Sequence, residues 1–407
     1  ASLRGESGCN QEAVDELDRL LDDATRIFGV NDPITLNTRS SLAFQLGKVG
    51  RLEKALEQFR NLLIDQTRLL GAEHPGTLDT RNNIAFVLFE LGRVRDAVNE
   101  YKALLDDRSR ILGTVHPSTL NTQGNLAFAL GSAGQIGQAI EQFKMLRKRI
   151  TRVLEPDHPD TLRACRNLAG WLSEDGQVDK AIEQLTVLRK RITRVLGADH
   201  PDTLATRAAL LTVMRRAHRY DEAMTMLTPL LADQLRVLGP DNPLTLRTRS
   251  TRASLRGDLG QINDAIVEFE SLYDDQVRVF GKDHPDVLRT RGNLADLIGC
   301  SGQAKKAYEM YQPLLADCAR ILGPDHPNTL IARNNCASWL IDAGDDQAAL
   351  VELTELLKDC GRALPSNDDL TRAVRNQLQR IEARRRIGLL IQAALKRIHR
   401  HSDKTSH

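Results

Sequence analysis

Residues 159–200 read PDTLRACRNLAGWLSEDGQVDKAIEQLTVLRKRITRVLGADH, and the same pattern begins again at Pro201. Its proline recurs every 42 residues without an insertion or deletion, and a histidine precedes it in six of eight units. The eight prolines are Pro33, Pro75, Pro117, Pro159, Pro201, Pro243, Pro285 and Pro327. Self-similarity at a fixed period of this size is typical of a solenoid, in which each unit buries its apolar face only against its neighbours. The function of such a chain is expected to reside in a surface and not in a catalytic pocket.

Each unit carries the signals for two helices joined by a tight turn. Gly71 ends one helix as a left-handed C-cap, and His74 and Pro75 open the next, because proline needs no amide partner at the first helical position. We expect helices over residues 75–91 and 94–112, separated by a glycine turn. Alanine recurs at one position of the second helix, and at one position of the first helix in all but the fifth unit, where only a small side chain allows the two helices to approach closely.

One stretch of the chain contains Asn167-Leu168-Ala169, Gly176, Ala181 and Gly197-Ala198-Asp199-His200-Pro201. This pattern resembles tetratricopeptide repeats (TPR), specifically the 42-residue kinesin-light-chain-like type, and it extends over nearly the whole chain. The resemblance implies an all-α, right-handed superhelical solenoid of antiparallel helix pairs. It also implies that the first helix of each pair lines a concave groove that binds peptides.

The repeat register divides the chain into three parts. Residues 1–28 form a partial repeat, residues 29–364 form eight 42-residue repeats, and residues 365–407 form a final half repeat and a basic capping helix. Ala1–Gly5 repeats the sequence of Ala253–Gly257, so the chain starts within a first helix, and we expect it to be a fragment of a longer protein. Only 13 of the 56 basic residues are lysine, and this arginine bias favours a bacterial, actinobacterial source.

Composition and charge argue against several classes of partner. The formal net charge is +2, and between residues 371 and 400 nine Arg or Lys face one acid, so the repeats themselves are mildly acidic. This balance and the aromatic content of 4% disfavour nucleic acid, which needs a continuous basic stripe. The apolar runs are too short to span a bilayer. The six cysteines lack the spacing of a metal or redox motif. We therefore expect a cytoplasmic protein with reduced cysteines and no membrane partner.

No catalytic, cofactor or metal site is predicted. The histidines occur once per repeat, and stacked helix pairs lie about 10 Å apart, whereas zinc ligands must lie about 2 Å from one ion. No Gly-rich phosphate loop, nucleophile elbow or carboxylate pair appears at a meaningful spacing. We expect a chain that is not an enzyme and that needs no cofactor.

The candidate binding residues occupy the positions that the resemblance places in the concave groove. Asparagine can both donate to and accept from a peptide backbone, and one groove position carries Asn83, Asn125, Asn167, Asn293 and Asn335. Three residues further along each unit, the early repeats carry Phe44, Phe86 and Phe128. The middle of the groove is predicted to be cationic, with Arg163, Arg166, Arg215, Arg247 and Arg289. A protein or peptide ligand with an apolar anchor and an acidic flank would fit this gradient. Alternatively, the asparagines bridge neighbouring helices, the phenylalanines pack internally and the arginines are only solvated.

Arginine and aspartate also recur at matched positions. Asp23 precedes Arg39 by sixteen residues, Asp65 precedes Arg81 by the same interval, and four later repeats keep this spacing. We predict from it a repeated salt bridge between adjacent helices.

The fifth repeat departs from the pattern. Leu211 stands where other repeats have alanine, and His218 replaces the glycine of the turn. We expect the bulky Leu211 to push the helix pair apart and to change the pitch of the superhelix near residues 207–220.

The function favoured by these observations is a non-catalytic protein–protein interaction scaffold that binds an extended segment along its groove. The alternative is the sensor or autoinhibitory region of a larger signalling or defence protein, such as a STAND-type NTPase, a protease or a peptide-maturation system. A P-loop or protease domain upstream of Ala1 would favour the second hypothesis.

Overall fold

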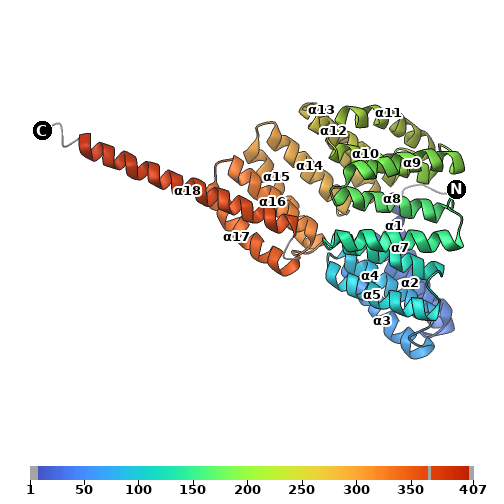
Figure 1. Ribbon diagram of the computed structural model, residues 1–407. Coiled ribbons are helices and arrows are strands. Elements are labelled where there is room, and N and C mark those ends of the chain that lie inside the picture. The colour runs from blue at the N-terminus through green and yellow to red at the C-terminus, as the bar shows by residue number, and fades with distance from the viewer. Residues whose placement is uncertain (1–7, 365–367, 403–407) are drawn as a thin grey trace. The chain divides into compact units, whose positions relative to one another are not determined.

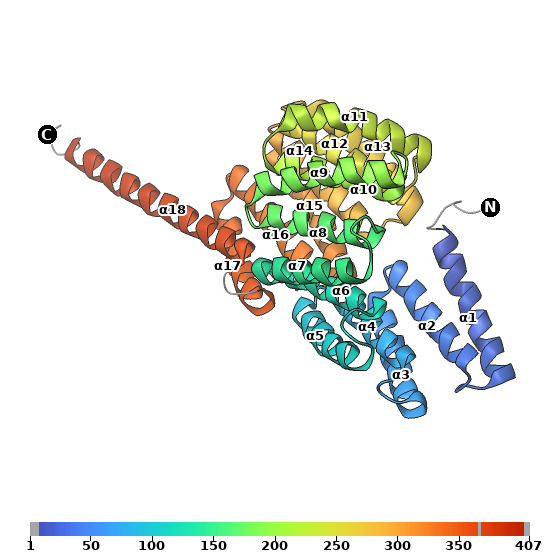
Figure 2. The same cartoon turned by 45° about the vertical axis from the view of Figure 1, so that its right-hand side comes forward.

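The computed structural model describes residues 8–364 and 368–402, with side chains for 12–364 and 368–387. These residues form eighteen α-helices and no strand (Figures 1 and 2). Consecutive helices pack against one another from α1 to α13 and again from α16 to α18. The prediction of an all-α solenoid of helix pairs is confirmed.

The chain forms two compact units. The first comprises Ala1–Leu297 with Ile321–Gly323, and the second comprises Ile298–Arg320 with Pro324–His407. Within the first unit lie α1 (Gly8–Phe28), α2 (Pro33–Lys48), α3 (Leu52–Leu70), α4 (Pro75–Glu90), α5 (Val94–Ile111), α6 (Pro117–Ser132), α7 (Ile136–Val153), α8 (Pro159–Glu174), α9 (Val178–Leu196), α10 (Pro201–Arg216), α11 (Tyr220–Val237), α12 (Pro243–Asp258), α13 (Ile262–Phe280) and most of α14 (Pro285–Cys300). The second unit holds most of α15 (Ala304–Ile321), and α16 (Pro327–Asp342), α17 (Asp346–Ala363) and α18 (Asp369–Ser402).

The residue before each repeated proline caps the helix that follows, as predicted. His74 Nδ1 accepts a hydrogen bond from Gly76 N at 3.1 Å, and five other histidines do the same in their repeats. In the two remaining repeats Asp32 and Asn242 accept the bond through a side-chain oxygen. An acceptor at this position satisfies an N–H group that the helix itself leaves without a partner.

The tight turn within each pair is a Schellman motif. After α4, Arg93 N donates to Leu88 O and Gly92 N donates to Phe89 O, and Gly92 has a φ of 72°. This motif needs a left-handed residue at the turn, which glycine provides without strain. Gly71, at the end of α3, has φ 90° and ψ 158°. Its φ is positive as predicted, but its ψ lies far from the left-handed helical value, so the prediction of a left-handed helical cap is wrong. Gly71 instead adopts an extended conformation with positive φ, which essentially only glycine can adopt.

The fifth repeat keeps the same turn despite its substitutions. His218 takes a φ of 55°, the only non-glycine residue with a positive φ in the described part of the chain, and Arg219 N still donates to Met214 O at 3.0 Å. Leu211 is 1% exposed and lies in the apolar core of its unit. The predicted change of pitch near residues 207–220 stays a prediction.

The core is built from the residues that recur in every repeat. The repeated alanines of α2 to α13, such as Ala85 and Ala97, are fully buried where paired helices cross. Leucine, isoleucine and phenylalanine side chains fill the space around them in clusters that extend from Val14 to Val279 in the first unit. In the second unit a cluster from Leu330 to Ile381 joins α16, α17 and α18.

The repeated ion pair exists, but its predicted partner was wrong. Arg39 bonds Asp65 on the following helix at 2.7 Å, and not Asp23. The same pairing joins Arg81 to Asp107, Arg207 to Asp233, Arg249 to Asp275, and Arg333 to Asp359. Each pair therefore links the two helices of one repeat, and its arginine side chain is largely buried.

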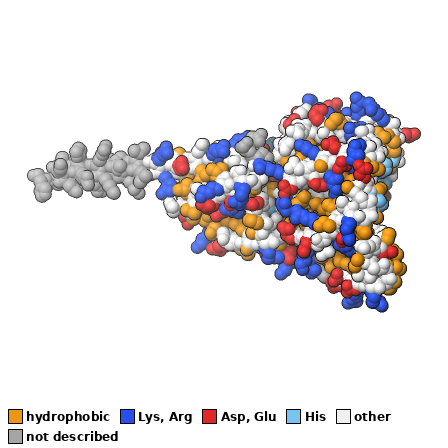
Figure 3. Space-filling view, turned by 90° about the horizontal axis from the view of Figure 1, so that it is seen from below, with side chains coloured by type: hydrophobic (Ala, Val, Ile, Leu, Met, Phe, Trp, Pro, Cys, Tyr) orange, Lys and Arg blue, Asp and Glu red, His pale blue; other side chains and the backbone are white. Residues whose placement is uncertain are grey.

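Basic and acidic side chains are also paired near the C-terminal ends of α11 and α13. Arg236 bonds Asp199 at 2.6 Å and Asp233 at 3.3 Å, and Arg278 contacts Asp241 and Asp275 in the same way. On the face shown in Figure 3, Lys and Arg side chains lie interspersed with Asp and Glu. Of the predicted half repeat and capping helix, residues 369–402 form one continuous helix, α18, and residues 365–367 and 403–407 lie outside the described residues.

Candidate ligand-binding groove

The first helices of the repeats lie on the inner side of the array in the first unit. The even-numbered helices contact one another in succession, α2 with α4, α4 with α6, α8 with α10 and α10 with α12. Helices on the inside of a curved stack approach more closely than those on the outside. Along each of them, buried residues such as Leu126 and Ala127 are followed by an exposed one, Phe128, because the helical period turns one face inward to the core and the next to the groove.

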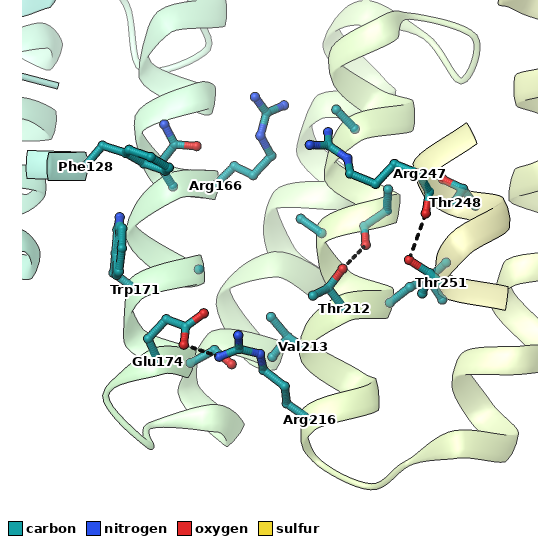
Figure 4. A pocket seen from close by; sticks show the side chains of 17 residues that line it. Phe128, Arg166, Trp171, Glu174, Thr212, Val213, Arg216, Arg247, Thr248 and Thr251 are labelled. Atoms are coloured by element: carbon teal, nitrogen blue, oxygen red, sulfur yellow. Dashed lines mark hydrogen bonds and ion pairs between the residues drawn. The ribbon is translucent and has the colours of Figure 1, made fainter. Parts of the chain in front are cut away.

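A pocket of about 580 Å³ opens between four of these helices, from α6 to α12. We call it the Trp171 pocket; it is lined by Phe128, Arg166, Asn167, Gly170, Trp171, Ser173, Glu174, Ala205, Ala208, Ala209, Leu211, Thr212, Val213, Arg216, Arg247, Thr248 and Thr251. Figure 4 shows Phe128 and Trp171 along one side, Arg166 and Arg247 toward one end, and Glu174 with Arg216 at the other.

An aromatic cluster builds the wall of the Trp171 pocket. The Phe128 ring meets Trp171 edge-on at 5.7 Å between centroids, and meets Phe89 at 5.5 Å. Phe128 remains 49% exposed, so the cluster presents an aromatic surface to the groove. Gly131 lies beneath the Trp171 ring, where an added Cβ would be 2.3 Å from a ring carbon. The absence of a side chain at Gly131 therefore sets the position of this wall.

The Trp171 pocket has a surplus of positive charge. Arg166 bonds Asp202 at 3.2 Å, and Arg216 forms an ion pair with Glu174. Arg247 is exposed and makes no ion pair with any residue that the structure describes. Burial lowers the pKa of Arg166; its bond to Asp202 opposes that shift, whereas the nearby charges of Arg163 and Arg247 add to it. The pocket therefore favours an anionic group beside its apolar wall.

A second pocket, of about 540 Å³, lies at the early repeats. We call it the Phe86 pocket; it is lined by Phe44, Gly47, Lys48, Val49, Gly50, Leu52, Phe59, Asn83, Phe86, Val87 and Glu90, and by residues 280–285. Phe44 and Phe86 are each 45% exposed, and Lys48 Nζ lies 5.2 Å from the centre of the Phe44 ring.

The structure divides the predicted asparagines. Asn83 and Asn167 line the two pockets. Asn125 donates to the side-chain oxygens of Asn82 at 3.4 Å and Asn121 at 3.3 Å, so it bridges α6 to α4, as the alternative interpretation expects. Asn293 lies on α14 outside both pockets, and Asn335, in the second unit, donates to the Tyr311 hydroxyl.

The predicted phenylalanines and arginines of the groove also differ in where they lie. Phe44 and Phe86 share one pocket and Phe128 lies in the other. Of the five arginines, Arg166 and Arg247 line the Trp171 pocket. The remaining three lie outside it and are paired with acids, Arg163 with Asp160, Arg215 with Asp258 and Arg289 with Asp286.

Sequence reasoning missed Trp171, Glu174 and Glu90. A signal for the tryptophan was present, because Gly131 and Trp171 recur as Gly299 and Trp339 exactly four repeats later. The second pair has the same geometry: a Cβ on Gly299 would be 2.5 Å from the Trp339 ring.

The fold and the groove define an α-solenoid built from helix–turn–helix repeats, with pockets on its inner helices. A family model described as tetratricopeptide repeat matches residues 40–106, 77–149, 118–191 and 286–359, which is more than half of the chain. The chain therefore belongs to the tetratricopeptide repeat family, as the sequence predicted. No curated protein matches this sequence. No helix among the described residues is long and apolar enough to cross a membrane.

Several solved structures are similar over large parts of the chain. The nearly identical TPR-like repeats of a protein assigned as a kinesin light chain in Podosopora anserina share 26% identity, cover 52% of this chain and 97% of theirs, and give a TM-score of 0.41. BtubC (BKLC) from P. vanneervenii shares 16% identity over 57% of this chain and 91% of its own, with a TM-score of 0.42. A Rap protein in complex with competence and sporulation factor shares 11% identity over 86% of this chain and 98% of its own, with a TM-score of 0.48.

Proposed function

We propose that this chain is a non-catalytic scaffold of a reducing, cytoplasmic compartment that binds an extended peptide segment on its inner helices. The observation that carries the proposal is the Trp171 pocket, which combines an exposed aromatic wall with Arg247, whose guanidinium has no ion-pair partner among the described residues. The pocket volume is in the range typical of ligand sites. Five cysteines of the described chain are free thiols, which fits such a compartment.

The pocket chemistry selects a ligand with an apolar anchor and an acidic flank. A large apolar side chain would pack on Phe128 and Trp171 and remove their exposed edges from water. A neighbouring carboxylate would reach Arg247, whose fork of donors suits a bidentate bond. Asn167 lies in the same pocket and offers both a donor and an acceptor to a peptide backbone.

Selection of displayed peptides on the whole chain tests this proposal. Binders are expected to contain a large apolar residue beside Asp or Glu. The variants Phe128→Ala and Arg247→Met should each weaken the selected peptides by about tenfold or more. Arg215→Met is the matched control, since Arg215 lies outside the pocket and bonds Asp258. Binders that lack acidic residues, or that tolerate both pocket variants, would contradict the proposal.

A further inference from the structure

The Phe86 pocket contains a carboxylate without a cationic partner. Glu90 is the last residue of α4, and it makes no ion pair with any residue in the described part of the chain. Glu174 holds the same position two repeats later, where it is neutralised by Arg216 of the following repeat. The repeat that follows Glu90 has Ser132 at this position instead.

Two features make the ionised form of Glu90 costly in the free protein. A helix C-terminus carries partial negative charge, so a carboxylate there is repelled. Burial raises the pKa of Glu90, because the carboxylate loses water without gaining a partner. The buried Tyr101 responds to the same charge, since its pKa is raised by burial and by Glu90. A cation that entered the pocket would relieve this cost.

The charged groups around Glu90 leave room for such a cation. Lys48, one repeat earlier at the same position, lies over the Phe44 ring and forms no ion pair with Glu90. Residues 280–285 also line this pocket and contribute Lys282, Asp283 and His284. The carboxylate of Glu90 is therefore available to a ligand that binds beside α4.

The rest of the Phe86 pocket suits the stem of a cationic side chain. Phe44 and Phe86 expose aromatic surface to it, with Phe59 buried beneath. Aromatic faces attract guanidinium and ammonium groups, and the Phe44 ring already holds Lys48 at 5.2 Å. Long basic side chains place their methylene groups on apolar surface while their heads seek a polar partner.

We propose that Phe44, Phe86 and Glu90 form a second subsite, which binds an arginine or lysine side chain of the peptide ligand. This inference rests on the proposed function, because it assigns the subsite to the same inner helices that hold the peptide. The two pockets then select opposite charges: a basic residue at α2 and α4, and an acidic flank beside Arg247. This arrangement would fix the direction of the bound segment as well as its composition.

The test uses two fluorescent peptides, an acetylated Phe-Arg amide and its Phe-citrulline counterpart, which has the same shape without the charge. Fluorescence anisotropy with the whole chain is expected to show about tenfold tighter binding of the arginine peptide, which corresponds to about 1.4 kcal/mol. Glu90→Gln should abolish this preference, and Phe86→Ala should weaken both peptides. Glu73→Gln is the control, since it removes an exposed charge that lines neither pocket.

Equal binding of the two peptides to the wild-type chain would overturn the proposal. So would a preference that survives Glu90→Gln, or binding of both peptides that is weakened by Phe128→Ala and not by Phe86→Ala. The outcome is separable from the test of the Trp171 pocket. If acidic peptides fail to bind there while the arginine preference depends on Glu90, the proposed function is wrong about its main pocket and this subsite stands. The reverse result removes the subsite alone.

Discussion

Replacing Gly131 by alanine tests whether the aromatic wall of the groove depends on one missing methyl group. Gly131 lies within α6 and is covered by the Trp171 indole of α8. An ideal Cβ would be 2.3 to 2.5 Å from three ring atoms, a separation that real side chains do not adopt. Either the indole must move or the two helices must separate.

The expected cost follows from three opposing effects. Alanine stabilises a helix interior by about 1 kcal/mol relative to glycine. Overpacking costs about 1–3 kcal/mol, and displacing the ring from Phe128 removes an aromatic contact worth about 0.5–1.5 kcal/mol. The clash exceeds the gain in helix propensity, and we expect Gly131→Ala to destabilise the first unit by roughly 2 kcal/mol.

Gly170→Ala is the matched control. Gly170 is one residue from Trp171 on α8, and a Cβ there would have nothing within 4 Å, so only the gain in propensity of about 1 kcal/mol remains. Urea unfolding followed by circular dichroism and by tryptophan emission measures both variants, since the chain has two tryptophans, Trp171 and Trp339. If Gly131→Ala were as stable as Gly170→Ala, with unchanged emission, the packing argument would be refuted.

Two further predictions concern the repeated interactions. Asp65→Asn should destabilise the chain by about 1 kcal/mol, because Arg39 is largely buried and would lose its carboxylate. Asp23→Asn should cost far less, since Asp23 pairs only with an exposed side chain; equal losses in urea unfolding would restore Asp23 as the partner of Arg39. His284 caps α14 only when its imidazole is neutral, and burial lowers the pKa of this imidazole. At a pH between the lowered pKa and the ordinary pKa of 6.5, the unfolded state therefore binds more protons than the folded state. The stability from this cap is therefore complete above about pH 6.5 and is lost as the pH falls toward the lowered pKa; His284→Asn should reduce the pH dependence measured by urea unfolding, and an unchanged dependence would contradict the assignment.

The local structure could be predicted from the sequence because its causes lie within a few residues. The His74 cap bonds the amide two residues later, and Pro75 fixes the first helical φ by its own ring. Gly92 gives the turn its positive φ without help from the rest of the fold. These features recur at the same position of every unit, so the 42-residue period makes them recognisable in the sequence.

The partner of each ion pair could not be read from spacing alone. In a chain with a 42-residue period, an arginine such as Arg39 has one aspartate sixteen residues before it and another twenty-six after it. The fifth repeat distinguishes the two candidates, because Arg207 has Arg191 sixteen residues before it and Asp233 twenty-six residues after it. Only Asp233 can form an ion pair with Arg207. An exception in the pattern was therefore more informative than its regular members.

The same reasoning separates the groove residues that we propose to bind a ligand from those whose charges are paired within the fold. A charge is neutralised where the next repeat carries the opposite charge at the same position, as Glu174 is by Arg216. A charge becomes available to a ligand where a neighbour breaks the sequence of pairs, as Ser132 does after Glu90. Arg247 is exposed among inner-helix arginines that are otherwise paired. In an array this regular, the charges left without a partner among the described residues are the basis of both proposals: Glu90 for a basic group of the ligand and Arg247 for an acidic one.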